Sequence, residues 1–172
     1  MIVHGIASTS SLDLVGSIIA AGAFDASIRE RGAENIPLLL SHEFKHPAGR
    51  ILALYQQDNS LRIIASVDRK LPGVSALLDS LKDGEQVGFS VGAVDVVGMD
   101  LGKVKLIIKA RLTEVSLTKH PANAECLITF ADRDEHLWPE DYREMFAEQA
   151  AATARFAGRF GNFLKKYPIK YA

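Results

Sequence analysis

Three polar residues in this sequence have side chains that together could hydrolyse a peptide bond: His42, Ser90 and Glu114. They lie in the segments LLLSHEFKHPAGR, DGEQVGFSVGA and LTEVSLTKHPANAE. A serine hydroxyl is a weak nucleophile until a base within hydrogen-bond reach takes its proton. Histidine suits that task because its pKa lies near neutrality, and a third group must orient the ring and stabilise the imidazolium. Any one of these residues alone is more often structural, so the pattern carries weight only as a set.

The strand pattern before Glu114 predicts that this carboxylate is buried. From position 103 to 112 all five even positions are apolar, and the basic residues fall on odd positions: Lys103, Lys105, Lys109 and Arg111. Since alternate side chains of a strand face opposite sides, the alternation places Glu114 and Ser116 on the apolar face. A buried carboxylate needs a partner. We predict that Glu114 faces the interior of the domain and binds the His42 ring; the alternative is a strand-end position that reaches solvent.

A competing motif overlaps the histidine. His42-Glu43-Phe44-Lys45-His46 matches H-E-x-x-H, a zinc metalloprotease signature. That motif works on a helix, where two histidines at i and i+4 point to one metal. Pro47 follows at once and disfavours helical backbone at His46. We interpret the match as coincidental, but a zinc enzyme using His42 and His46 remains an alternative.

Several short motifs follow one another in a characteristic order over roughly residues 3 to 130. They are Gly22-Ala23-Phe24, an apolar run ending in His42 and leading to Gly49-Arg50, Gly88-Phe89-Ser90-Val91-Gly92, and Glu114 to Leu117 followed by Pro121 to Asn123. In this order they resemble the prohead (capsid maturation) serine proteases of tailed phages. Two segments depart from the family pattern. Glu43-Phe44-Lys45 replaces a short His-Asp/Asn turn, and Lys119-His120 replaces an apolar pair.

The resemblance implies a serine endopeptidase with a barrel similar to that of the herpesvirus assembly proteases. It implies His42 as general base and Ser90 as nucleophile, with Glu114 as the matching acid and His120 as the reserve candidate for the third position. Gly88 and Gly92 would let backbone approach the serine closely. Ser116 and Asn123 are interpreted as local hydrogen-bonding residues.

The same resemblance implies where the protein acts and on what. The substrate would be a major capsid or scaffold protein, cleaved in a limited way inside immature phage heads in the host cytoplasm, with self-association or self-cleavage as further options. A second alternative is a non-enzymatic assembly or scaffold protein that retains the protease fold. No cofactor and no metal is expected.

The elements that must position these residues are mostly strands. The pattern predicts strands over 1–10, 36–41, 51–57, 61–67, 87–97, 103–117 and 127–130, and helices over 22–31 and from Pro72 to Asp83. We therefore expect a mainly β domain over residues 1–131, a closed or nearly closed barrel flanked by helices. Residues 132–172 are expected to form a C-terminal extension with a helix over about 139–166. This helix either packs on the barrel, or is exposed and docks on a scaffold or capsid protein or is removed by self-cleavage.

Composition excludes several classes of protein. With 48% hydrophobic and 24% charged residues and a net charge of −1, the sequence is typical of a globular domain and does not indicate binding to nucleic acid or to a membrane surface. The single cysteine, Cys126, rules out a disulfide within the chain. The N-terminus does not resemble a signal peptide, and no apolar run approaches the ~20 residues of a membrane span. We therefore expect a soluble, intracellular protein.

Overall fold

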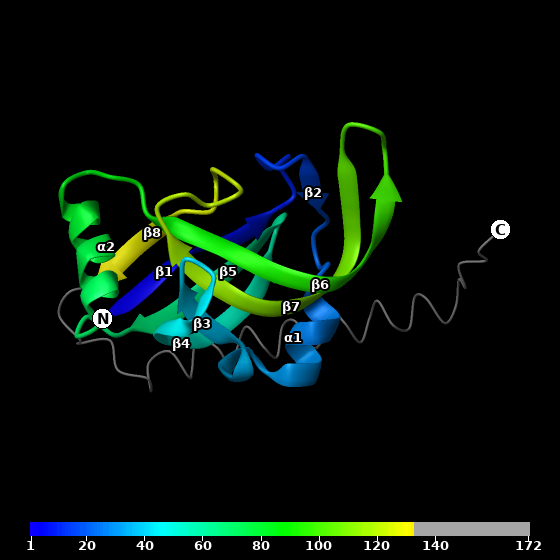
Figure 1. Cartoon of the computed structure of the whole chain (residues 1–172). Coiled ribbons are helices and arrows are strands. Elements are labelled where there is room, and N and C mark those ends of the chain that lie inside the picture. Colours follow the sequence, from blue (N-terminus) through cyan, green and yellow to red (C-terminus); the bar gives the residue numbers. More distant parts are fainter. Residues whose placement is uncertain (133–172) are drawn as a thin grey trace. The chain divides into compact units, whose positions relative to one another are not determined.

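Eight strands form one sheet in residues 1–132, the part of the chain that the computed structural model describes (Figure 1). The strands are β1 Ile2–Thr9, β2 Ser17–Ile19, β3 Pro37–Leu40, β4 Glu43–Gln57, β5 Ser60–Val67, β6 Gly88–Asp100, β7 Lys105–Thr118 and β8 Ile128–Asp132. The prediction of a mainly β unit is confirmed. The expected helix over about 139–166 lies outside the described residues.

Strand β7 is the centre of the sheet. Along one edge it pairs in parallel with β2 and β3, and along the other it pairs with β6 in a long antiparallel hairpin. The path then continues from β3 through β4, β5 and β1 to β8. The sheet curls into a half-barrel, and an isolated bridge joins Gly88 of β6 to Leu127 just before β8. At this bridge a Cβ atom on Gly88 would lie 2.1 Å from the carbonyl oxygen of Cys126, so the close approach requires glycine.

Two α-helices and one short 3-10 helix complete the unit. Helix α1, Asp25–Arg31, and the 3-10 helix η1, Ala33–Asn35, connect β2 to β3. Helix α2, Pro72–Lys82, begins with proline in its first turn, where the missing N–H costs no hydrogen bond. It packs an apolar face of Val74, Leu77 and Leu78 into the core. Both predicted helices are confirmed to within a few residues. None of the helices in the described residues is long and apolar enough to cross a membrane.

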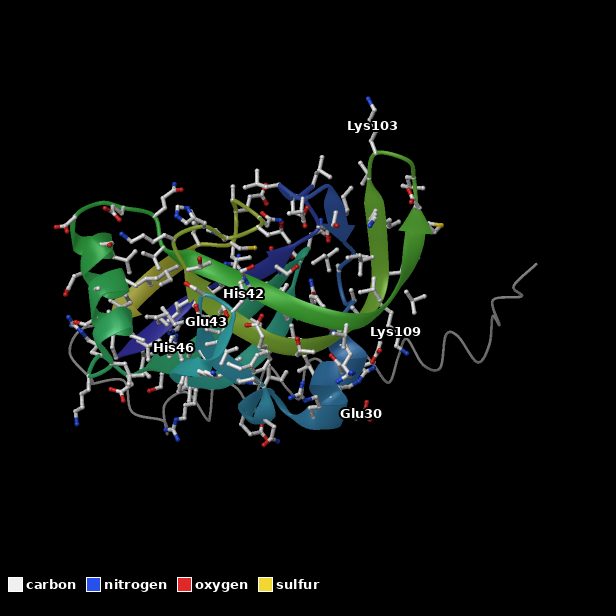
Figure 2. All side chains as sticks on the ribbon, in the orientation of Figure 1. Glu30, His42, Glu43, His46, Lys103 and Lys109 are labelled. Carbon is white, nitrogen blue, oxygen red and sulfur yellow. The ribbon has the colours of Figure 1, made fainter. Side chains whose placement is uncertain are left out.

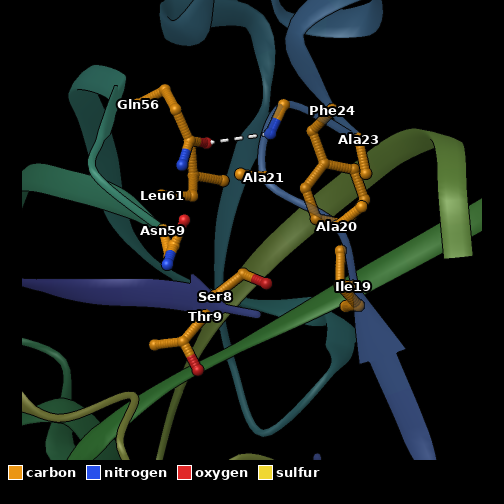
Figure 3. Close-up of a pocket in the computed structure, with 11 residues that line it drawn as sticks. Ser8, Thr9, Ile19, Ala20, Ala21, Ala23, Phe24, Gln56, Asn59 and Leu61 are labelled. Atoms are coloured by element: carbon orange, nitrogen blue, oxygen red, sulfur yellow. Dashed lines mark hydrogen bonds between the residues drawn. The ribbon is translucent and has the colours of Figure 1, made fainter. Parts of the chain in front are cut away.

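The segment before α1 is held against the β4–β5 hairpin. The backbone N–H of Gly22 donates to Oε1 of Gln56 at 3.2 Å (Figure 3). The cavity enclosed there has a volume of only about 10 Å³, which is about the size needed for one water molecule. It is therefore a packing gap under the Gly22-Ala23-Phe24 segment and too small to bind a substrate.

The alternation predicted for the strand before Glu114 is interrupted twice. Ile108 is 48% exposed, whereas Ile107 packs against the core, because the β6–β7 register shifts near Val97. At a second shift, Gly92 of β6 pairs with Glu114 of β7, whereas the next residue, Ala93, pairs with Leu112. One residue of β7 between these pairs is therefore extra. One extra residue reverses the face of every later side chain.

The second shift decides where Glu114 lies. Leu112, Val115 and Leu117 all belong to the hydrophobic core. By alternation from Val115, the side chains of Glu114 and Ser116 therefore lie on the sheet face opposite the core. The prediction that Glu114 faces the barrel interior is wrong in this respect, although the residue is buried as expected.

Candidate active site

His42 occupies the tight turn between β3 and β4. Leu40 of β3 pairs with Glu43 of β4, so Ser41 and His42 are the two loop residues of a β-hairpin. Both are left-handed, with φ of 51° and 65°, as a type I′ turn requires at its two central positions. Such turns favour Asn and Gly, and a left-handed residue of another type costs on the order of 1–3 kcal/mol. The strained turn therefore has to be held by its surroundings.

Strand β7 supplies the groups that hold this turn. Because β3 and β7 pair in parallel, the backbone N–H of Ser41 donates to the carbonyl oxygen of Leu117 at 3.0 Å. The next N–H, that of His42, donates to Oγ of Ser116 at 2.9 Å. Two successive amide groups of the turn are thus bonded to two successive residues of β7.

The ring of His42 contacts the carboxylate of Glu114. Nδ1 of His42 lies 2.7 Å from Oε1 of Glu114, and the predicted contact between the two residues is therefore present. Glu114 is 3% exposed, while the His42 side chain is 47% exposed. A buried carboxylate bonded to Nδ1 fixes the ring orientation and favours the tautomer whose Nε2 can accept a proton.

Ser116 joins the turn and the acid. Its hydroxyl donates to Oε2 of Glu114 at 2.7 Å while it accepts the backbone N–H of His42. Ser116 is fully buried. Both carboxylate oxygens of Glu114 therefore have partners, which satisfies a charge that burial would otherwise penalise. Sequence reasoning identified Ser116 only as a local hydrogen-bonding residue, because its two partners become neighbours only when β3 pairs with β7.

Ser90 lies on the neighbouring strand, on the same face as this network. It pairs with Ser116 across the β6–β7 ladder, and Gly92 pairs with Glu114. Directly opposed residues of an antiparallel pair have Cα atoms about 4.5–5.5 Å apart with side chains on one face. Ser90 is mostly buried, and its neighbours Phe89 and Val91 point to the opposite, core side. The pairing therefore places the serine beside the residue that anchors His42.

Gly92 makes room for the carboxylate. A Cβ atom built on it would lie 2.3 Å from Oε1 of Glu114, far inside van der Waals contact. The glycines around Ser90 were expected to let backbone approach the serine closely. Instead, Gly92 accommodates Glu114 and Gly88 accommodates the Cys126 carbonyl, so each glycine serves a specific neighbour.

The H-E-x-x-H segment is not helical. Glu43 begins strand β4 and His46 lies within it, so the backbone needed to direct His42 and His46 to one metal is absent there. Nδ1 of His46 instead lies 3.1 Å from Glu43 on the exposed hairpin (Figure 2). Within residues 1–132 no group of three or more His, Cys, Asp or Glu side chains is arranged to hold a metal ion.

The reserve candidate for the third position lies apart from these contacts on the exposed surface. His120 follows β7, and its backbone N–H donates to Oγ1 of Thr118. The adjacent Lys119 forms an ion pair with Glu85. Of the two candidates, Glu114 is the one that the structure shows in contact with the His42 ring.

Comparison with known proteins agrees with this architecture. In the solved structure of the bacteriophage T4 capsid assembly protease, gp21, a similar fold covers 67% of this chain and 79% of that protein, with a TM-score of 0.54 and 13% sequence identity. At that identity the likeness establishes the fold. No curated protein matches the sequence significantly. The model of the caudovirus prohead serine proteases matches residues 6–138, and the chain belongs to this family.

Proposed function

We propose that the chain is a serine endopeptidase that cleaves a capsid or scaffold protein during phage head maturation. The contact between Nδ1 of His42 and the buried carboxylate of Glu114 carries the proposal. A surface histidine has no need of a buried carboxylate whose two oxygens both have hydrogen-bond partners. A catalytic base uses such a carboxylate to orient its ring and to stabilise the imidazolium. Family membership and the fold shared with a capsid assembly protease support the same conclusion.

The mechanism assigns one task to each residue. Nε2 of His42 takes the proton of the Ser90 hydroxyl as Oγ bonds to the carbonyl carbon of the scissile peptide. Collapse of the tetrahedral intermediate breaks the C–N bond, and the imidazolium returns its proton to the leaving amine. Water, deprotonated by the same ring, then hydrolyses the acyl-enzyme and restores Ser90. Throughout, the carboxylate of Glu114 stabilises the imidazolium.

Ser116 acts as a positioning residue in this scheme. It binds the backbone of His42 and the far oxygen of Glu114, so the base and the acid are fixed to one hydroxyl. The rigid β7 strand therefore preorganises the pair, which is how enzymes keep catalytic groups within a fraction of an ångström of productive geometry.

Family membership supports a proposal for the substrate and the place of action. Prohead proteases act in immature heads, and we propose that this chain acts there, within the host cell, on a capsid or scaffold protein. The likeness to a protease of capsid assembly supports this substrate class over a general degradative role.

Labelling and substitution of Ser90 test the proposal. A fluorophosphonate should label the wild-type protein on Ser90, and Ser90→Ala should abolish both labelling and cleavage of the co-expressed capsid or scaffold protein. Because the change removes one oxygen and no backbone contact, circular dichroism should be unchanged. Full cleavage by a folded Ser90→Ala protein would refute serine catalysis. His42→Ala should match Ser90→Ala in activity, with His46→Ala, an exposed histidine four residues away, as the matched control.

A further inference from the structure

A pocket of about 240 Å³ opens beside Ser90, on the core side of β6. That volume is many times the roughly 10–15 Å³ needed to hold one water molecule, so the pocket can admit a side chain. Its walls come from the end of β1, the segment around β2, strand β6, Ile107 of β7 and the loop before β8. The side chains that matter below are those of Ile19, Val91, Val96 and Ile107 on the apolar side and Asp13 on the polar side.

The pocket adjoins a strand edge that could hold a peptide. β6 pairs with β7 along one edge, and its other edge is bonded to the Cys126–Leu127 segment only at Gly88 and Phe89. Beyond Ser90, within residues 1–132, no strand pairs with that second edge of β6. Unpaired N–H and C=O groups of an edge strand bind extended peptides by adding a strand to the sheet.

An added strand would present side chains to both faces of the sheet. Successive side chains alternate, so one residue of the peptide would lie on the face of Ser90 and His42 while the next points to the opposite face. The pocket lies on that opposite face, where Val91 and Ala93 line it. Ser90, which precedes Val91 in the sequence, also borders the pocket. Its occupant is therefore a residue close to the scissile bond.

The chemistry of the walls selects the occupant. No basic side chain lines the pocket, and the one carboxylate, Asp13, already accepts the backbone N–H groups of Val15 and Ser17 at 3.0 and 2.6 Å through Oδ1. Burial raises the pKa of the Cys126 thiol to about 12, so this thiol is uncharged. A substrate carboxylate would lose water there without gaining a cationic partner, whereas an apolar side chain gains by burial.

We propose that this pocket is a specificity site that binds an uncharged apolar side chain of the substrate next to the scissile bond. The inference rests on the proposed function, because the substrate is placed by Ser90 as nucleophile. It identifies Val96 as a specificity-determining residue at the rim, since Val96 lines the pocket while 52% exposed and so can be changed without disturbing the core.

Cleavage-site profiling tests the proposal. The full chain is incubated with a proteome-derived peptide library, and the residues around each cut are counted by mass spectrometry. One position near the cut should favour Leu, Ile, Val, Met or Phe over Asp and Glu by about tenfold, at the low end of discrimination by apolar pockets. Val96→Lys should reduce that ratio at least about threefold by admitting acidic residues. The matched control is Val97→Lys, on the same strand, 58% exposed and outside the pocket, which should keep the wild-type profile.

The outcomes separate the two proposals. Cleavage that requires Ser90 but shows no apolar preference at any position would overturn the pocket assignment alone. The same holds if Val96→Lys and Val97→Lys change the profile equally. If no cleavage depends on Ser90, the proposed function fails, and the assignment of the pocket fails with it.

Discussion

Nδ1 of His42 lies 2.7 Å from Oε1 of Glu114, although 72 residues separate the two in the chain. The contact exists because β3 pairs in parallel with β7, which brings the turn after β3 over the last residues of β7. The carboxylate is buried and both its oxygens are bonded, while the ring is about half exposed. One side of the histidine is therefore fixed by the protein and the other is left for a substrate and a nucleophile.

Glu114→Gln should keep the fold and lose most of the rate. An amide can still orient the ring, but it cannot stabilise the imidazolium as well as a carboxylate does. Removing the acid of a well-studied triad costs about 10⁴-fold; we expect a smaller loss here, of about 10²–10³-fold, because Ser116 still binds the backbone of His42. The measurement is kcat/KM on a cleavable capsid-derived peptide, with thermal unfolding as the check on folding.

The matched control for that change is Glu125→Gln. Glu125 is an exposed carboxylate that accepts a hydrogen bond from Ser11 and not from His42. Glu125→Gln should keep the stability within about 0.5 kcal/mol, as is usual for surface substitutions, and should keep the wild-type rate. Equal rates for Glu114→Gln and wild type would remove Glu114 from the catalytic set and return attention to His120.

Ser116→Ala should lower both stability and rate. It leaves Oε2 of Glu114 and the N–H of His42 without their buried partner, which costs about 1–3 kcal/mol. We expect kcat to fall about tenfold with KM nearly unchanged, because the base is displaced while the substrate surface is intact. Urea unfolding and steady-state kinetics measure the two effects. Ser90→Ala is the control, since it should lose the rate and keep the stability. A Ser116→Ala protein that is less stable yet fully active would show that Ser116 has a structural role only.

Much of the architecture was predictable from local patterns. The turn at Asp58 and Asn59 between two apolar strands predicts the β4–β5 hairpin, and Pro72 followed by spaced leucines predicts α2; both are found. The three-residue strand β2 was missed because so short a segment has no measurable periodicity. The first eight residues of β4 were missed because most of them are exposed, they show no apolar alternation and Pro47 interrupts them.

The site shows what alternation alone does not reveal. The contact between Glu114 and His42 was predicted, but from an unbroken alternation that would have turned Glu114 toward the core. A bulge beside Gly92 turns it to the other face, where the β3–β4 turn carries His42. Bulges depend on how two strands pair, and pairing between distant segments is absent from a one-strand pattern. The link that Ser116 makes between His42 and Glu114 likewise depends on the pairing of distant strands, here β3 with β7.

Metal chelation should leave activity unchanged. His42 lies in the β3–β4 turn and His46 lies within β4, so the two rings are not presented from one helix as a shared zinc ion requires. Incubation of the purified protein with a strong chelator, followed by metal analysis and a cleavage assay, measures this directly. His46→Ala should likewise retain the rate. Loss of activity on chelation that added zinc restores would support the metalloprotease alternative.

Gly92→Ala should inactivate the enzyme through Glu114. The new Cβ would lie 2.3 Å from Oε1 of Glu114, the oxygen that binds His42, so the carboxylate must move away from the ring. The backbone at Gly92 is not left-handed, and the added methyl therefore acts through this clash rather than through backbone strain. We expect kcat/KM to fall about as far as in Glu114→Gln, by 10²–10³-fold, with a loss of stability of about 1–3 kcal/mol from the displaced buried charge.

A double-mutant cycle distinguishes this clash from a general effect on β6. In a Glu114→Ala background the clashing carboxylate is gone, so adding Gly92→Ala should cost little further rate or stability. The coupling energy between the two changes should then account for most of the effect of Gly92→Ala alone. Additive losses in the double variant would mean that Gly92 is needed by β6 itself and that its role opposite Glu114 is incidental. Rates and urea midpoints for the four proteins of the cycle give both quantities from one set of preparations.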